Sequence, residues 1–310
     1  MVAIRSFAAV SFVVAAALTS LGAASSPARA EATGLELVYQ NLTVVRLNPQ
    51  GAQNAFELSL RHGLYDPGDS QVLANNYVGL IVAPILTPGH ARLGVALDLR
   101  PLNILKLEAR VEYLNWFGNF NLTQSYPDTG ADFSDTAIEA AGDAGLNYAT
   151  DGWQLTLDAE VRAKIGPVII RSRAKLAFVD MALRGGDRVF YDQYYDLLEP
   201  GNGWFLVNDA DVLLSLGEHW IVGLRDSIGT SFFADSAYPA GETSTDSVPT
   251  HRLGPLVAYR FWDEPGAGFN QPTVLLIVNW YLSHRWRTGS DVSQAIPYVV
   301  LGFAFNGSLL

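Results

Sequence analysis

Two segments of the chain alternate apolar and polar residues without interruption. From Leu105 to Tyr113 every second residue is apolar and the residues between are charged, and residues 153–164 alternate in the same way. Successive side chains of a β-strand point to opposite faces, so both segments are predicted to be strands with one apolar and one polar face. Strands in soluble sheets average about five or six residues. The greater length of these two favours strands that cross a membrane.

The composition is apolar overall and poor in charge. Of the 310 residues, 49% are hydrophobic and 16% are charged, with a net charge of −11, whereas soluble domains average about 25% charged residues. The negative balance excludes a nucleic-acid-binding protein, and the many aromatic residues exclude a disordered or collagen-like chain. Cysteine is absent, which excludes disulfide scaffolds, thiolate metal sites, cysteine nucleophiles and cysteine-linked lipids.

Residues 1–30 are predicted to be a secretory signal peptide. Arg5 supplies a positive start, residues 7–17 form a short apolar core, and Ala28-Arg29-Ala30 provides the small residues that a signal peptidase recognises. Cleavage after Ala30 removes two of the 20 basic residues and leaves 18 against 31 acidic ones. The alternative is an uncleaved membrane anchor, and the short apolar core argues against it.

Residues 31–310 are predicted to form a single domain. They contain no apolar run of about 18 residues, the length that a membrane helix needs. The closest candidate, 77–86, has ten residues and includes Pro84. Because no repeat or linker divides this part of the chain, its apolar residues must be spread over many short segments, as in β-structure.

Twelve strands are predicted along this domain. They span residues 35–47, 52–62, 75–86, 91–100, 103–116, 152–164, 167–181, 203–215, 219–233, 251–262, 272–286 and 295–307. From the fifth strand on, long connections follow odd-numbered strands, as in transmembrane barrels with long outside loops and short periplasmic turns. The long connection 63–74 and the short one 87–90 fit this scheme less well, so ten or fourteen strands remain alternatives.

Aromatic residues gather at the ends of the predicted strands. The outside ends carry Trp116, Phe117, Trp153, Trp204, Phe232, Phe233 and Trp286, and the periplasmic ends carry Trp220, Phe261 and Trp262. Amphipathic rings are enriched where a membrane meets water, so two such bands are expected of a barrel in a bilayer. Packing in a soluble core is the alternative, which explains the rings but not their positions.

On these features the chain resembles the bacterial outer-membrane β-barrel proteins as a class, without matching one family by motif. The resemblance implies an all-β fold, a transmembrane antiparallel up-and-down β-barrel, inserted into the outer membrane by the barrel-assembly machinery and surrounded by lipid and lipopolysaccharide. Known twelve-stranded members include small-solute channels and an outer-membrane phospholipase A. The chain departs from the class at its end, because such barrels usually finish on an aromatic residue and here Phe305 is followed by five others.

The polar faces of three neighbouring strands are predicted to line the barrel lumen. The residues concerned are Lys106, Glu108, Arg110, Glu112, Asp158, Glu160, Arg162, Lys164, Arg171, Arg173 and Lys175. A turn at Gly166-Pro167 places residues whose numbers sum to 331–333 opposite one another, which pairs acidic with basic side chains. Two interpretations remain open, an ion-pair network that fills a narrow barrel and a charge-lined conduit for ions or small polar solutes.

The outside loops are acidic. Asp128, Asp132, Asp135, Glu139, Asp143 and Asp151 accumulate in one, and Asp187, Asp192, Asp196 and Glu199 surround three tyrosines in the next. A solvated surface is the simplest interpretation. Divalent cations on the carboxylates or sugars on the tyrosines are alternatives, although neither loop has calcium-loop spacing. No metal site and no cofactor are predicted.

A basic group is predicted at the outside rim, where His251, Arg252, His284, Arg285 and Arg287 are expected to contact lipopolysaccharide phosphates. The two histidines also raise the possibility of a lipid-modifying enzyme. Ser283 is adjacent to His284 and should point to the opposite face of a regular strand, which argues against a serine-histidine pair there. The sequence therefore predicts a passive channel for small polar solutes or ions, with a lipid-modifying enzyme, a closed structural or adhesive barrel and a soluble secreted β-protein as alternatives.

Overall fold

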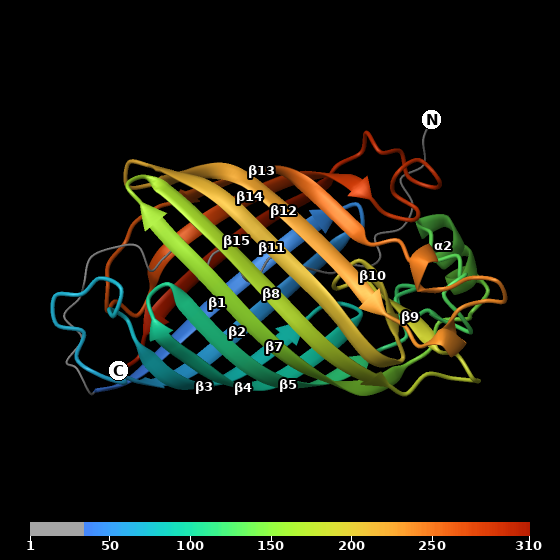
Figure 1. Cartoon of the computed structure of the whole chain (residues 1–310), viewed down its shortest axis with the longest axis horizontal. Helices are drawn as coiled ribbons and strands as arrows, with labels where there is room; N and C mark the ends of the chain where they lie inside the picture. Colours follow the sequence, from blue (N-terminus) through green and yellow to red (C-terminus); the bar gives the residue numbers. More distant parts are fainter. Residues whose placement is uncertain (1–33) are drawn as a thin grey trace.

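The computed structural model describes residues 34–310, so the predicted signal peptide and its cleavage site lie outside the described residues. The chain forms an antiparallel barrel that closes by pairing its first strand with its last (Figure 1). The strands of the barrel are β1 (Leu35–Leu47), β2 (Gly51–His62), β3 (Tyr77–Leu86), β4 (His90–Leu102), β5 (Leu105–Trp116), β7 (Thr150–Ile165), β8 (Val168–Met181), β11 (Asn202–Leu216), β12 (Trp220–Phe232), β13 (Thr250–Arg260), β14 (Asn270–Ser283) and β15 (Tyr298–Ser308). The predicted all-β fold with twelve barrel strands is confirmed, and ten and fourteen are excluded.

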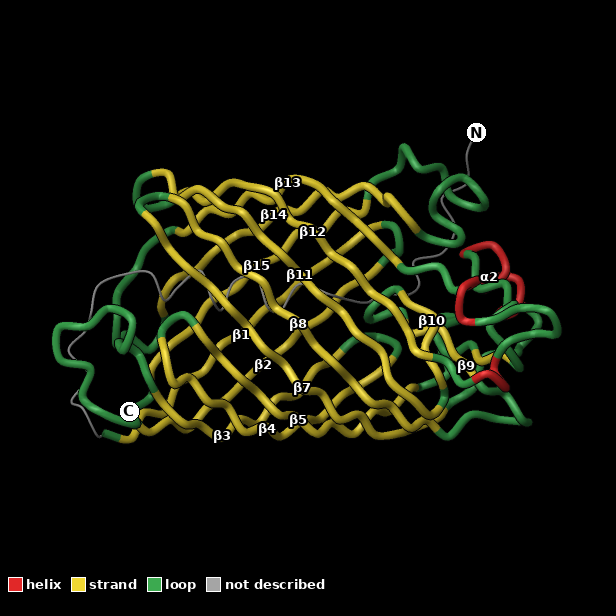
Figure 2. Tube along the Cα trace, viewed as in Figure 1, coloured by secondary structure: helices red, strands yellow, loops and turns green. Residues whose placement is uncertain are grey.

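The two ends of the barrel differ in their connections (Figure 2). The start of β1 and the end of β15 lie at one end, called here the terminal end, together with tight turns such as 103–104, 166–167 and 217–219. The opposite end, called the loop end, carries the long connections, namely 117–149, 182–201, 233–249 and 284–297. From β5 on, long connections therefore follow alternate strands, as the sequence indicates. The first four strands differ, because the connection 63–76 at the terminal end is long, and the connections 48–50 and 87–89 at the loop end are short.

The barrel wall exposes apolar side chains and buries polar ones. On β4, Leu93, Val95 and Leu97 are 57%, 54% and 63% exposed. Arg92 and Asp98, which flank this run and point to the other face, are 2% and 0% exposed. This arrangement is the inverse of a soluble barrel, and it is typical of the two-residue period of strands whose outer face meets lipid.

Exposed aromatic rings form a band at each end of the wall. Trp153, Trp204 and Phe232 are exposed toward the loop end, and Trp220 and Trp262 are exposed toward the terminal end. Trp116 is an exception to the predicted band. Its ring points inward, where it is 1% exposed and packs on His90 with 4.4 Å between ring centroids.

Smaller elements cluster at the loop end. They are β6 (Ser125–Tyr126), α2 (Asp135–Asp143), β9 (Val189–Asp192), β10 (Leu197–Pro200) and the 3₁₀ helices η2 (Asp235–Ala237) and η3 (Ser244–Asp246). β10, β9 and β6 form a separate three-stranded sheet. Every residue from 189 to 200 is buried, and this stretch is called here the plug segment. Within residues 34–310, no helix is both long and apolar enough to cross a membrane.

Candidate functional site: a plugged, charge-lined lumen

The plug segment is tied to the barrel wall by ion pairs. Asp192, at the end of β9, accepts a hydrogen bond from Arg92 of β4 at 2.6 Å, and both side chains are 1% exposed. The Arg92 guanidinium also lies over the ring of Tyr194, 4.1 Å from its centroid. Arg46 of β1 donates to the backbone oxygen of Gln193. Charged wall residues therefore find their partners in the plug, because a buried charge is tolerated only when it is paired.

Asp196 is the second attachment point, in the turn between β9 and β10. Its carboxylate accepts hydrogen bonds from the hydroxyls of Tyr191 and Tyr281 at 2.6 and 2.5 Å, and Arg287 Nε lies 3.3 Å away. His284 Nε2 is 3.5 Å from the same oxygen that Arg287 contacts. Burial alone would raise the pKa of Asp196, but Arg287 and His284 outweigh it and hold that pKa well below its usual range. The plug is thus held by an ionised carboxylate.

Glu199 of β10 is in the opposite situation. It is 0% exposed, and neither of its carboxylate oxygens has a hydrogen-bond partner among the described residues. Burial, and after it the nearby Asp192, raises the pKa of Glu199 well above its usual range, despite the opposing effect of Arg92. The plug therefore contains one acid that is stabilised as a carboxylate and one that favours its protonated form.

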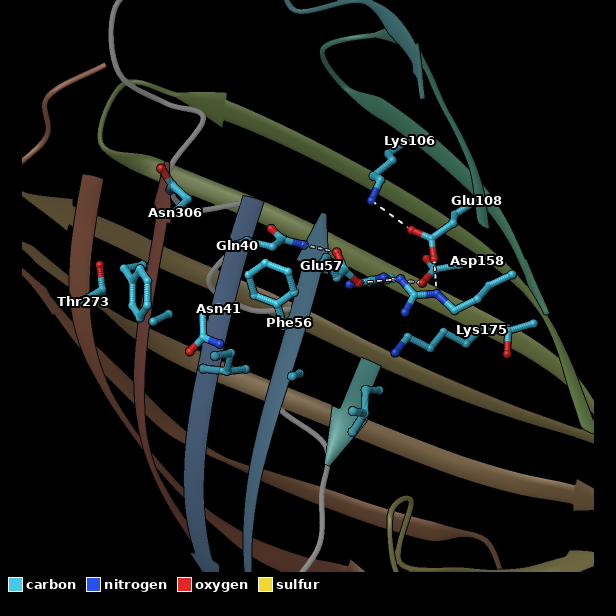
Figure 3. Close-up of a pocket in the computed structure, with 18 of the residues that line it drawn as sticks. Gln40, Asn41, Phe56, Glu57, Lys106, Glu108, Asp158, Lys175, Thr273 and Asn306 are labelled. Atoms are coloured by element: carbon cyan, nitrogen blue, oxygen red, sulfur yellow. Dashed lines mark hydrogen bonds and ion pairs between the residues drawn. The ribbon is translucent and has the colours of Figure 1, made fainter. Parts of the chain in front are cut away.

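Beneath the plug lies a cavity of about 1100 Å³, part of which is open solvent. Tyr194 and Tyr195 of the plug segment border it on the side of the loop end. Part of its wall is apolar and comes from Leu42, Ala55, Ile85, Ile221 and Ala304, and another part is charged and comes from β5, β7 and β8 (Figure 3). A further hollow at the terminal end, open to solvent, shares Glu57 and Lys106 with it. The lumen is therefore hollow toward the terminal end and filled toward the loop end.

Most of the predicted lumen residues lie along this cavity. Lys106, Glu108, Arg110, Glu112, Asp158, Arg173 and Lys175 line it, and Glu160 lines the hollow at the terminal end. Glu108 contacts both Lys106 at 3.1 Å and Arg110 at 2.7 Å, and Arg110 also contacts Glu57 of β2. The predicted register across Gly166-Pro167 is confirmed, because partners on β7 and β8 sum to 333.

Three of the predicted lumen residues lie away from the central cavity. Arg171 is 2% exposed and pairs with Asp211 within the barrel wall. Arg162 donates to the backbone and side-chain oxygens of Asn103 at the terminal end, both at 3.0 Å. Lys164 is exposed beside the turn that follows β7. A role of any of these residues in conduction stays a prediction.

The predicted basic rim divides into two residues that lie apart from the plug and three that face it. His251 Nε2 lies 2.7 Å from Asp226 on the outer face, and Arg285 donates to the backbone oxygen of Thr129 at 2.6 Å. Arg252, His284 and Arg287 are only 4%, 4% and 2% exposed, and all three lie beside Asp196. This corrects the expected lipopolysaccharide contact for these three, because their charged groups face the plug. For His251 and Arg285 that contact stays a prediction.

The same geometry separates the two histidines that suggested an enzyme. His251 pairs with Asp226, whereas His284 lies beside Asp196 inside the loop end. The hydroxyl of Ser283 donates to the backbone oxygen of Pro249 at 2.8 Å. Among residues 34–310, no group of three or more histidine, cysteine, aspartate or glutamate side chains could hold a metal ion.

The plug itself is what the sequence interpretation missed. Asp192, Asp196 and Glu199 were expected on a solvated loop surface, and the structure instead buries them in the loop end of the barrel. Residues 189–198 contain two leucines, a valine, a phenylalanine and three tyrosines. A stretch so rich in apolar and aromatic side chains is unusual for a solvated loop, and this was the available signal.

Comparison with known proteins gives structural similarity alone. No family model and no curated protein matches the chain. Solved structures that are similar include the outer membrane protein Omp33 of Acinetobacter baumannii (10% identity over 89% of this chain and 97% of that one, TM-score 0.36), OccAB1 of the same organism (8%, 90% and 97%, 0.39) and the translocator domain of the autotransporter NalP from Neisseria meningitidis (13%, 94% and 92%, 0.36). At these identities and TM-scores the similarity carries no information on cargo or activity.

Proposed function

We propose that the chain is an outer-membrane channel for small polar solutes or ions and that the plug segment closes it in this state. The observation that carries the proposal is the division of the lumen. A cavity with a charged wall on β5, β7 and β8 and an apolar wall elsewhere reaches toward the terminal end, and the buried stretch 189–200 fills the loop end. Rings of charged side chains around a lumen select ions and small solutes.

In this proposal the terminal end faces the periplasm and the loop end faces outward. The export signal in residues 1–30, insertion by the barrel-assembly machinery and lipopolysaccharide contacts at His251 and Arg285 belong to the same proposal. The exposed apolar wall between two aromatic bands supports the membrane location, because such a surface is stable in lipid and prone to aggregate in water.

The way the plug is attached favours a movable gate and argues against a permanently filled lumen. In the backbone hydrogen-bond ladder, β9 pairs with β10 and with β6. Neither β9 nor β10 pairs with a strand of the barrel. The plug reaches the wall chiefly through side chains, including the Asp192–Arg92 pair and the hydrogen bond from Tyr281 of β14 to Asp196. Those contacts can break without disturbing the hydrogen-bond ladder that closes the barrel.

The test is conductance in planar lipid bilayers. Replacing residues 189–200 with a glycine-serine stretch of equal length is expected to produce steps of several-fold larger conductance than the wild-type chain. Replacing residues 240–246, which are exposed in another loop of the same end, is the matched control and should leave conductance unchanged. A folded plug variant that conducts no ions at any voltage would overturn the channel proposal.

A further inference from the structure

Lys175 differs from the other lysines of the chain in its surroundings. The chain has three lysines, Lys106, Lys164 and Lys175. Lys106 contacts Glu108 at 3.1 Å and Asp98 at 3.4 Å, and Lys164 is exposed at the terminal end. Lys175 lines the central cavity, and no ion pair or hydrogen bond of its ammonium group occurs among the described residues. In Figure 3 no dashed line reaches its side chain.

The register of the barrel explains why this ammonium group is left without a partner. Lys175 lies directly opposite Asp158 on β7. Arg173 is two residues away on the same face of β8, and its Nε at 2.6 Å and Nη2 at 2.5 Å both contact Oδ2 of that carboxylate. Two N–H donors of one guanidinium group therefore already occupy this oxygen. Asp209 of β11 accepts a hydrogen bond from Ser227 and is not within ion-pair distance of Lys175.

The cavity around Lys175 also offers an apolar surface. Leu42, Ile85 and Ile221 line it from other strands, and Tyr194 and Tyr195 close it toward the loop end. A ligand that used both surfaces would have one anionic group and a short apolar body. A carboxylate would supply the charge-assisted hydrogen bond that Lys175 lacks, and the apolar body would cover the aliphatic wall.

We propose that Lys175 is the head-group site for small amphipathic carboxylates that enter the cavity from the terminal end. The proposal rests on the proposed function, since it takes the cavity to be the inner part of the channel lumen. It adds the class of solute and the residue that recognises it. Inorganic phosphate has the charge without the apolar body and should bind more weakly than such a carboxylate.

The test uses hexanoate as the probe, titrated into the purified full chain in neutral detergent and followed by calorimetry. We expect saturable binding of hexanoate and at least about tenfold weaker binding of acetate and of the uncharged hexanamide, since each lacks one of the two features. Lys175→Met should weaken hexanoate binding about tenfold or more, and Lys175→Arg should retain it. Lys164→Met is the matched control and should bind hexanoate as the wild-type chain does.

Two outcomes would overturn this site. One is a folded Lys175→Met variant that binds hexanoate as tightly as the wild-type chain, and the other is equal binding of hexanamide and hexanoate. Folding of each variant is checked by the mobility difference between heated and unheated samples on gels. The channel proposal fails separately, by absent conductance of the plug variant in chloride salts, a measurement that needs no carboxylate.

Discussion

Asp211 lies between two arginines in the barrel wall. It pairs directly across the strands with Arg171 of β8 and with Arg225 of β12, so one carboxylate serves two guanidinium groups in a single row. Arg225 contacts the two oxygens of Asp211 at 2.8 and 3.0 Å, and Arg171 contacts one of them. All three side chains are 2% exposed or less. Removing the carboxylate would take away the one acid that both buried cations contact, and Glu160 is 3.9 Å from Arg171.

Asp211→Asn is therefore expected to lower the free energy of unfolding by about 3 kcal/mol, the usual cost of breaking a buried ion pair. Urea unfolding of the chain in lipid vesicles, followed by tryptophan fluorescence, measures the change. Glu218→Gln, in the exposed turn between β11 and β12, is the control and should shift the free energy by no more than about 0.5 kcal/mol. Equal stability of the two variants would contradict the role given to Asp211.

At the scale of the element, the plug segment combines two acids of opposite behaviour. The pKa of Asp196 is lowered on insertion, so Asp196 stabilises the inserted plug until the pH falls through that low value. The pKa of Glu199 is raised on insertion. Above the ordinary glutamate pKa of 4.5, Glu199 therefore loses its proton in a released plug and keeps it in the inserted plug. The inserted state of the plug therefore becomes less stable, relative to the released state, as the pH rises from about 5 through the raised pKa of Glu199.

Conductance is accordingly expected to increase with pH in the wild-type chain, because ionisation of Glu199 favours release of the plug. Glu199→Gln cannot ionise and should remain closed over the same pH range. Cleavage by chymotrypsin after Tyr194 or Tyr195 gives an independent measurement, since both residues are buried while the plug is inserted. Glu242→Gln, exposed in another loop of the same end, should titrate as the wild-type chain does. A Glu199→Gln variant with the wild-type pH dependence would contradict this prediction.

At the scale of the whole molecule, the barrel depends on an apolar outer wall. Leu97 lies near the middle of β4 and is 63% exposed on that wall. An arginine there would face hydrocarbon, and near the middle of the membrane this costs about 2–4 kcal/mol. Leu97→Arg should therefore lower the stability of the folded barrel in vesicles by roughly that amount, measured by urea unfolding.

Leu64→Arg is the control for this substitution, because Leu64 is exposed in the connection between β2 and β3 at the terminal end, beyond the strands. It should change stability little. If Leu97→Arg were equally harmless, the outer wall would not be facing lipid, and the alternative of a soluble secreted barrel would gain support.

The sequence by itself indicated the twelve strands of the barrel, with ten and fourteen as alternatives, and the register about Gly166-Pro167. Each of these follows from a local rule, namely that side chains of a strand alternate between two faces and that tight turns fix the pairing of the strands that they join. The alternation in residues 105–113 and 153–164 also predicts, without any tertiary contact, that the charged residues of β5 and β7 share the inner face.

The tertiary structure alone decided what fills the lumen. Asp192 and Arg92 are 100 residues apart, and Asp196 and Arg287 are 91 apart, so no local pattern could pair them. Asp196 is also far in sequence from Arg252, His284 and Arg287. Their burial around it could therefore not be predicted, and the sequence indicated an exposed basic rim instead. Which cation lacks a partner was likewise settled by geometry, because Arg173 and Lys175 compete for one carboxylate and the distances decide between them.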